Sequence, residues 1–115
     1  MKVVSIDTAK HYKWGEKCDG WHLVKSAMLS VIQERVPSGC SEIRHFHQKS
    51  EQFFYILSGN AVIEADGVVH SLITGQGLHI PAKVPHQLKN TSSQDLVFVV
   101  TSVPPSHGDR IEARA

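Results

Sequence analysis

The sequence predicts an all-β domain, either a sandwich or a closed barrel, and three observations support this fold class. Short runs rich in β-branched and aromatic residues recur along the chain, with turn signals at a spacing of roughly 8–12 residues. No stretch of ten residues combines apolar side chains at helical spacing with a helix cap. Asp66-Gly67, between two such runs, is the strongest signal for a tight β-hairpin in the sequence. The pattern therefore predicts about nine or ten short strands in one domain.

The expected strands cover most of the chain as far as Pro104-Pro105. Their residue ranges are 3–6, 21–24, 28–36, 41–47, 52–57, 61–65, 68–73, 78–80, 86–90 and 96–103. A polar loop joins the first two, and we expect its Tyr12 and Trp14 to pack at an edge of the fold. We divide the single domain 1–115 into N-terminal strands and loop (1–25), a barrel (26–104) and a polar tail (105–115) that we expect to be mobile.

Composition and charge exclude several kinds of function. The 115 residues are 41% hydrophobic and 20% charged, and the net charge of +1 offers no electrostatic basis for binding nucleic acid or an acidic membrane. No apolar run approaches the roughly 20 residues of a membrane span, and the N-terminus lacks the apolar core of a signal peptide. Cys18 and Cys40 form no disulfide framework. We therefore expect a cytoplasmic protein with free thiols.

Two of the expected strands are apolar on both faces, namely those that contain residues 53–57 and 96–100. A strand with one face in water would alternate more cleanly between polar and apolar residues. One face of each strand must therefore line the interior, and the other must be covered by the N-terminal strands or by a second subunit. We predict a homodimer.

Histidine is the unusual residue, with eight copies in the chain. His45 and His47 are two residues apart, so on a strand both imidazoles leave the same face, roughly 7 Å apart along the chain. Both ring nitrogens can then converge on one metal ion at about 2.0–2.1 Å. A polar turn follows, and a second strand brings Glu51 or Gln52 back beside the histidine pair. This arrangement predicts a metal site.

A second stretch, residues 75–90, carries His86 after two prolines. Because proline cannot lie in a central strand of a sheet, these two residues place His86 at the start of a strand. The two stretches together resemble the two signature motifs of the cupin superfamily. The pattern G-x5-H-x-H-x3,4-E-x6-G fits residues 39–59 with Gln52 in place of Glu. The pattern G-x5-P-x-G-x2-H-x3-N fits residues 75–90 with Lys83 in place of Gly. The resemblance implies the family's double-stranded β-helix (jelly-roll) barrel.

The resemblance also implies a metal site whose ligands are His45, His47, Gln52 and His86. Glu51 lies directly beside Gln52, and neighbouring residues of a strand point to opposite faces, so only one of the two can reach the metal. The motif spacing favours Gln52, whereas the apolar residues that follow do not decide between the two faces. Cupins similar in motif that open unsaturated uronate sugars use a glutamine at this position.

A glutamine ligand would change the chemistry of the site. It coordinates through a neutral carbonyl oxygen, whereas a glutamate brings a full negative charge. With three neutral imidazoles the site keeps the charge of a divalent metal, which raises Lewis acidity and disfavours a trivalent state. Zn, Ni, Cu, Fe and Mn all suit such ligands.

We therefore expect a Lewis-acid enzyme, isomerase-like or lyase-like, whose small-molecule ligand is an oxygenated compound such as a sugar acid. A non-enzymatic metal-binding or ligand-binding sensor and an Fe(II) dioxygenase are the alternatives, because the fold alone does not fix a function.

The sequence also suggests places for the other histidines and for four charged residues. His79 is expected behind the metal ligands or at the surface, and the remaining histidines are expected at the surface: His11, His22, His70 and His107. Four charged strand residues become candidates for a general acid, a general base or a carboxylate clamp if they face inward: Glu34, Glu42, Arg44 and Glu64. Phe53 and Tyr55 are expected in the core or a dimer interface. No catalytic residue is identified from the sequence.

Overall fold

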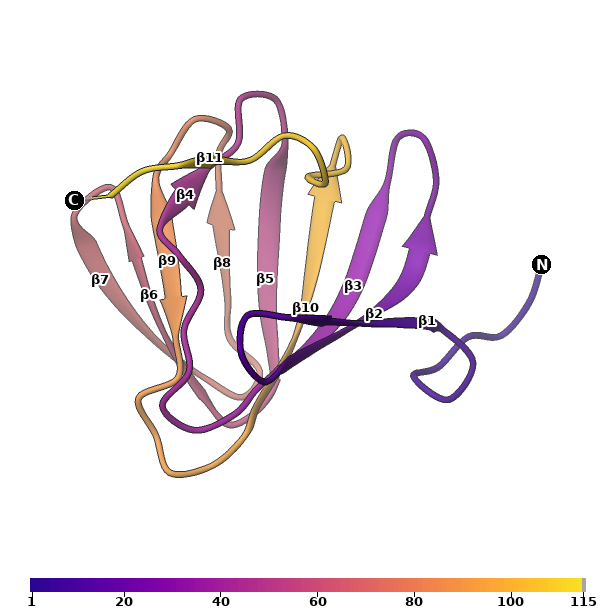
Figure 1. Ribbon diagram of the computed structural model, residues 1–115, viewed down its shortest axis with the longest axis horizontal. Helices are drawn as coiled ribbons and strands as arrows, with labels where there is room; N and C mark the ends of the chain where they lie inside the picture. Colours follow the sequence, from indigo (N-terminus) through magenta and orange to yellow (C-terminus); the bar gives the residue numbers. More distant parts are fainter. Residues whose placement is uncertain (115) are drawn as a thin grey trace.

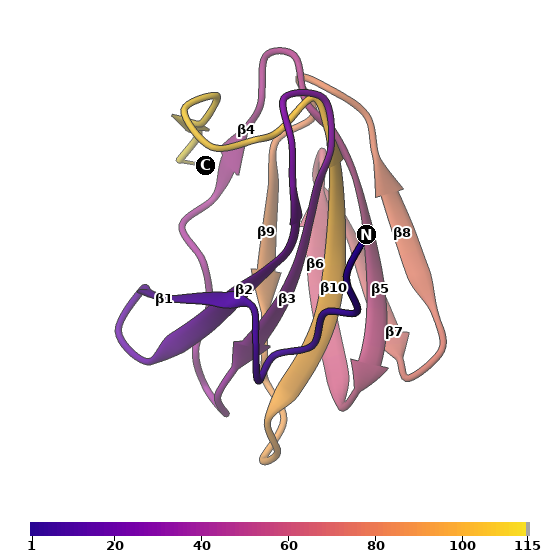
Figure 2. The ribbon, with the colours of Figure 1, turned by 90° about the vertical axis from the view of Figure 1, so that its right-hand side faces the viewer.

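The computed structural model describes residues 1–114, which form two antiparallel β-sheets that face each other (Figures 1 and 2). The strands are β1 (Lys10–Trp14), β2 (Cys18–Lys25), β3 (Ser30–Val36), β4 (His45–Phe46), β5 (Glu51–Ser58), β6 (Asn60–Ala65), β7 (Val68–Ile73), β8 (Gly77–Ile80), β9 (His86–Lys89), β10 (Leu96–Val103) and β11 (Ile111–Glu112). One sheet has the order β1-β2-β3-β10-β5-β8, and the other has the order β11-β4-β9-β6-β7. Residues 1–114 contain no helix, and hence none that could cross a membrane. The all-β prediction is confirmed.

The predicted hairpin at Asp66-Gly67 joins β6 to β7. The backbone φ angles are 50° at Asp66 and 84° at Gly67, and Ala65 pairs with Val68 across the turn. Positive φ at both central residues is what a primed two-residue turn requires, because its twist matches that of the flanking strands.

Two of the expected strands in the first half of the chain are placed differently. Residues 3–6 form no strand, and β1 instead covers Lys10–Trp14, in the segment predicted to be a loop. β1 pairs with β2 from Lys10↔His22 to Trp14↔Cys18, and a tight turn joins the two strands. β1 is therefore the edge strand of the larger sheet. The expected strand 41–47 is reduced to His45–Phe46, preceded by a single bridge between Ser41 and Lys89.

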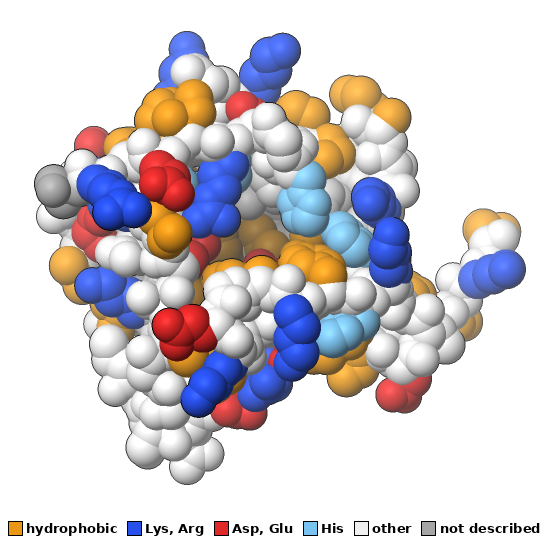
Figure 3. Space-filling view, in the orientation of Figure 1, with side chains coloured by type: hydrophobic (Ala, Val, Ile, Leu, Met, Phe, Trp, Pro, Cys, Tyr) orange, Lys and Arg blue, Asp and Glu red, His pale blue; other side chains and the backbone are white. Residues whose placement is uncertain are grey.

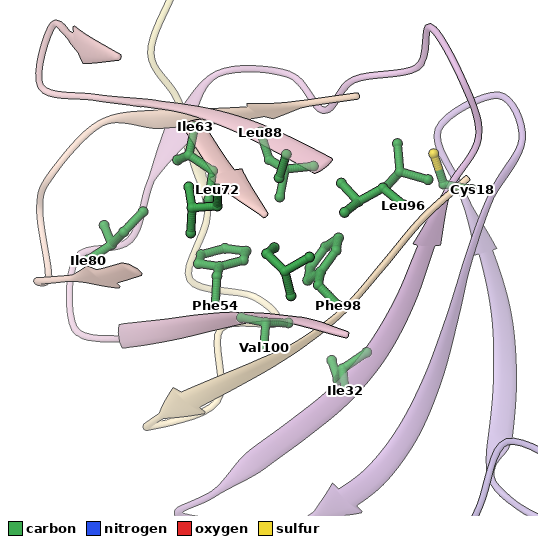
Figure 4. Close-up of a cluster of buried hydrophobic side chains, with 13 residues drawn as sticks. Cys18, Ile32, Phe54, Ile63, Leu72, Ile80, Leu88, Leu96, Phe98 and Val100 are labelled. Carbon is green, nitrogen blue, oxygen red and sulfur yellow. The ribbon is translucent and has the colours of Figure 1, made fainter. Parts of the chain in front are cut away.

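The apolar core lies between the two sheets (Figure 4). Phe54 and Ile56 of β5 and Phe98 of β10 point into it, and the rings of Phe54 and Phe98 lie 5.6 Å apart. The same inward faces end in polar residues, since Gln52 of β5 and Ser102 of β10 are also buried and pair in register. Along these two strands the interior therefore changes from an apolar core to a polar end.

The C-terminal segment, which the sequence predicts to be a polar tail, forms the short strand β11. It crosses over β4 (Figure 1), where Ile111 pairs with Phe46 and Glu112 pairs with His45. The N–H of Ala113 also donates to the carbonyl of Arg44 at 2.9 Å. The edge of β4 offers backbone groups that need partners, and the tail supplies them.

Lys83, which stands where the second motif has glycine, takes the backbone conformation that glycine favours. Its φ is +72°, and its N–H donates to the carbonyl of His47 at 2.6 Å. A left-handed backbone costs a residue with a side chain roughly 1–2 kcal/mol. The loop before β9 thus keeps the motif's geometry without its glycine.

Candidate metal centre

Three buried histidines meet at the polar end of the barrel. His45 of β4 and His86 of β9 lie directly opposite each other in the smaller sheet, and His47 follows just after β4. Each offers one ring nitrogen, and these three atoms all lie within 4.8 Å of one another. The exposed fractions are only 4%, 5% and 1% for His45, His47 and His86. These three residues could hold a metal ion.

The hydrogen bonds of the three rings fix which nitrogen is available. Nδ1 of His45 lies 2.7 Å from the carbonyl oxygen of Ile43, and Nδ1 of His86 lies 2.9 Å from that of Val84. Nδ1 of His47 makes the same kind of contact with the carbonyl oxygen of Asp109. A carbonyl can only accept, so each Nδ1 must carry the proton. Each Nε2 therefore presents its lone pair, as a metal ligand must.

Burial also keeps these rings neutral. Desolvation lowers the pKa of all three histidines, and it lowers that of His45 to about 3. The neighbouring imidazoles add to the effect, since a charge on one disfavours a charge on the next. Neutral rings at neutral pH are the form that binds a cation.

Gln52 faces the same space, and Glu51 does not. Gln52 is 6% exposed, and its Nε2 donates to Ser102 Oγ at 3.0 Å, which leaves Oε1 free. Glu51 is exposed on the outer face, where its carboxylate lies 3.0 Å from Nε2 of His79. His79 is thus a surface residue. Of the two neighbours that the sequence leaves open, only Gln52 shares the cavity with His45 and His47.

The donor atoms are suited to a divalent transition metal. Nε2 of His47, Nε2 of His86 and Oε1 of Gln52 are buried without a hydrogen-bond partner among the described residues. Leaving a buried polar atom unpaired costs about 1–3 kcal/mol. Imidazole nitrogens and one neutral oxygen are ligands that Zn, Ni, Cu, Fe and Mn accept, so a metal ion would satisfy all of these atoms at once.

A cavity of about 390 Å³ leads to the histidines. Figure 3 shows a hollow in the face of the molecule, with a basic side chain on its upper left, histidine side chains on its right and hydrophobic side chains below it. The apolar part of the cavity wall consists of Tyr12, Trp14, Ile32, Phe54 and Val100. Tyr12 and Trp14, which we expected to pack at an edge, line this cavity as well as the core, because positions 12 and 14 share one face of β1.

Two carboxyl groups, those of Glu34 and Glu42, also line the cavity. Burial, followed by the charge of Glu42, raises the pKa of Glu34 to about 8. Burial raises the pKa of Glu42 to about 7, although its Oε1 accepts the N–H of Leu88 at 2.9 Å, which favours the charged form. The guanidinium of Arg110 at the cavity lowers both pKa values without cancelling the effect of burial. Both groups can therefore exchange a proton near neutral pH.

Arg44 and Glu64, the other charged candidates, pair with each other instead. Arg44 Nε lies 2.6 Å from Glu64 Oε1, and Arg44 Nη1 donates to the carbonyl of Ala113 at 2.9 Å. Neither residue lines the cavity that leads to the histidines. They connect the C-terminal segment to the smaller sheet.

Two histidines expected only at the surface lie at or near the cavity mouth. His107 lines the cavity and packs edge-on against Tyr12, with ring centroids 5.8 Å apart. His22 is half-buried, and its ring lies 5.0 Å from that of Tyr12 and 5.3 Å from that of His107. The positions of both histidines depend on the pairing of β1 with β2 and on the path of the C-terminal segment. No sequence motif indicates either of these two features.

Comparison with known proteins identifies the family. The model of the Cupin domain family matches residues 32–102. The uncharacterised protein MJ1618 of Methanocaldococcus jannaschii is 32% identical over 89 residues, which cover 76% of this chain and 71% of MJ1618. Protein SchB of Streptomyces halstedii is 41% identical over 82 residues, which cover 70% of this chain and 58% of SchB.

Solved structures with different activities share the fold. The polyketide cyclase RemF from Streptomyces resistomycificus has a TM-score of 0.83 at 20% identity, covering 100% of this chain and 87% of RemF. A sugar phosphate isomerase of the cupin superfamily from Silicibacter pomeroyi has a TM-score of 0.80 at 18% identity, covering 90% of this chain and 76% of that protein. At these identities the likeness establishes the double-stranded β-helix fold, and the reaction must be argued from the site.

Proposed function

The chain belongs to the cupin family, and from that premise we propose that it is a metal-dependent Lewis-acid enzyme acting on a small, enolisable carbonyl compound. The ligands would be His45, His47 and His86, with Gln52 as the fourth. A divalent transition metal held by them would polarise a carbonyl oxygen and acidify the adjacent C–H bond. The metal site alone would serve a binding protein equally well.

The observation that carries the proposal is the pair of carboxyl groups in the same cavity. An enzyme of this kind needs a titratable group beside the metal site, whereas a pure binding site does not. Glu34 and Glu42 provide two such groups, and in the metal-free protein burial raises their pKa values to about 8 and about 7. A group with such a pKa both removes and returns a proton efficiently. In this proposal Glu34, in its carboxylate form, takes the proton from carbon, and Glu42, which lines the same cavity, protonates oxygen.

The cavity wall bears on the substrate class. Aromatic and aliphatic side chains form one part of the wall, and polar or charged side chains form the rest, which suits a flat, unsaturated carbon skeleton that carries oxygen atoms. We propose a 1,3-dicarbonyl compound, a class that includes polyketide chains, because its flat carbon skeleton would pack against the apolar part of the wall, and a sugar acid is the alternative. The similarity in fold to RemF, a polyketide cyclase, is consistent with this choice.

The first prediction is that the metal-loaded protein accelerates exchange of the central CH₂ hydrogens of a β-ketoamide with D₂O. Such a compound is enolisable but exchanges slowly by itself, so proton NMR can follow the rate above the buffer background. Positioned acid–base groups contribute about 10²–10⁴-fold to such steps. Background rates with full metal occupancy would contradict the proposal and favour a binding protein. Turnover of a uronic acid would favour the sugar-acid substrate, and oxygen uptake with Fe(II) would favour a dioxygenase.

We also propose the homodimer, and the outer face of the larger sheet is its candidate interface. Phe53, Tyr55 and Leu57 project outward from β5 with exposed fractions of 44%, 41% and 41%, and Val103 of β10 is 42% exposed. No N-terminal strand covers these four side chains. A stable dimer buries about 800 Å² on each partner, and a sheet face can supply that area.

The second prediction concerns this face. Sedimentation equilibrium is expected to give a mass near twice 12.7 kDa for the wild-type protein. Tyr55→Lys should give a monomer, because it places a charge in the centre of the interface. Val69→Lys, on the exposed outer face of β7, is the matched control and should remain dimeric. A wild-type monomer would refute the proposal.

A further inference from the structure

Asp109 holds the turn that carries His47, from a position 62 residues further along the chain. Its carboxylate accepts three consecutive backbone N–H groups: Gln48 to Oδ1 at 2.9 Å, Lys49 to Oδ2 at 2.9 Å and Ser50 to Oδ2 at 3.0 Å. Its backbone carbonyl accepts the Nδ1–H of His47. The side chain and the main chain of one residue thus engage four residues in a row.

His47 differs in this respect from the other two histidines of the triad. His45 and His86 donate to carbonyls only two residues earlier, at Ile43 and Val84, so their own segments set their ring orientation. Both also sit on paired strands, β4 and β9. His47 lies beyond the end of β4, and its partner comes from another part of the chain. Its orientation therefore depends on how the C-terminal segment docks.

The docking of that segment is fixed at several points. Downstream of Asp109, β11 pairs with β4, and Arg110 Nη2 donates to the carbonyl of Ile43 at 3.2 Å. Upstream, Ser106, His107 and Gly108 line the cavity. Asp109 is the point where the segment attaches to the ligand-bearing turn, and its three charge-assisted hydrogen bonds are of the stronger kind.

We propose that Asp109 is a positioning residue for the metal site, which it completes by anchoring the turn 47–50 and presenting its carbonyl to His47. The inference rests on the proposed metal site. It makes the C-terminal segment part of that site, in addition to its role in the fold. Partners that orient a ligating histidine typically contribute about 10–100-fold to metal affinity.

Two substitutions at Asp109 and one control test this role. Asp109→Ala removes all three side-chain bonds, which frees the segment and withdraws the carbonyl from His47. Asp109→Asn keeps one acceptor oxygen, which in the place of Oδ2 still serves Lys49 and Ser50. Glu112→Ala removes an exposed carboxylate from the same segment. Zinc dissociation constants from competition with a chelator should rise about 10–100-fold for Asp109→Ala, rise less for Asp109→Asn and stay unchanged for Glu112→Ala.

A measurement on the metal-free protein separates positioning from simple stabilisation. Long-range ¹H–¹⁵N spectra report the tautomer of His47, which should be the single Nδ1–H form in the wild type and a mixture in Asp109→Ala. The tautomers of His45 and His86 should not change. The inference would be overturned by a folded variant that has wild-type zinc affinity and an unchanged His47 tautomer. If Asp109→Ala does not fold, the same two measurements on Asp109→Asn decide the role of Asp109. A wild-type protein that binds no zinc would refute the proposed function, and the tautomer measurement would still decide the role of Asp109.

Discussion

We expect the wild-type protein to be purified with a stoichiometric metal ion and the His86→Ala variant to be purified without it. His86 is 1% exposed, and its Nε2 is a buried atom with no partner among the described residues. Removing it leaves two imidazoles, which bind a cation much more weakly than three, so the loss should exceed the roughly 100-fold that a missing outer partner costs. Elemental analysis of the dialysed protein measures the metal content directly.

Thermal unfolding gives an independent measurement of the same loss. A ligand that binds only the folded state stabilises it by about 2.7 kcal/mol at a concentration 100 times its dissociation constant. Added zinc should therefore raise the unfolding temperature of the wild type and leave that of His86→Ala unchanged. His79→Ala and Glu51→Ala, which remove the exposed pair on the outer face, should keep full metal content. Undiminished metal in both His86→Ala and His45→Ala would refute the site.

The parts of the fold that the sequence predicts well are those with local signals. The bounds of β7 and β10 agree with the expected ranges, because turn residues flank both runs. The hairpin is predicted correctly because Asp66-Gly67 is a dipeptide that readily adopts two positive φ angles. In the site, the spacing of His45 and His47 predicts a histidine pair, the resemblance to the cupin motifs adds His86, and the structure brings these three residues together.

The residues that the sequence does not predict are those placed by contacts between distant segments. Tyr12 and Trp14 reach the cavity because β1 pairs with β2. No turn dipeptide between the two strands predicts that pairing. Arg110 reaches the cavity, and Asp109 reaches the turn 47–50, because a two-residue strand, β11, pairs with β4. A polar segment of that length carries no periodicity. The choice between Glu51 and Gln52 likewise required the register of β5, since both faces of that strand are apolar further along.

Glu34→Gln is expected to lower the rate of β-ketoamide exchange by about 10²–10⁴-fold while metal content stays at the wild-type level. Glutamine has nearly the same shape and keeps the cavity polar, but it cannot take a proton from carbon. Glu34 lines the same cavity as the imidazoles without being one of the proposed ligands, so metal affinity should not depend on it. The comparison of exchange rate with metal content therefore separates catalysis from binding.

The same substitution is expected to stabilise the metal-free protein at alkaline pH. The pKa of Glu34 is about 8 in the folded state, whereas an unfolded glutamate has a pKa of about 4.3. Between these values the folded state holds a proton that the unfolded state has lost, so this group makes stability fall as pH rises from about 4.3 through about 8. The glutamine side chain of the variant does not titrate, so the gain from Glu34→Gln should be small at pH 5 and largest above pH 8.

Urea unfolding at pH 5 and pH 8.5 measures this difference, with Glu16→Gln on the exposed surface as the matched control. The depressed pKa values of His45, His47 and His86 act in the opposite direction, since they lower stability only as pH falls below about 6.5. That contribution is common to the wild type and the variant and cancels in the comparison. A variant with wild-type exchange rates, or with the same stability difference at both pH values, would remove Glu34 from the proposed mechanism. A variant that is more stable but inactive would show that the buried carboxyl lowers the stability of the fold and is required for the reaction.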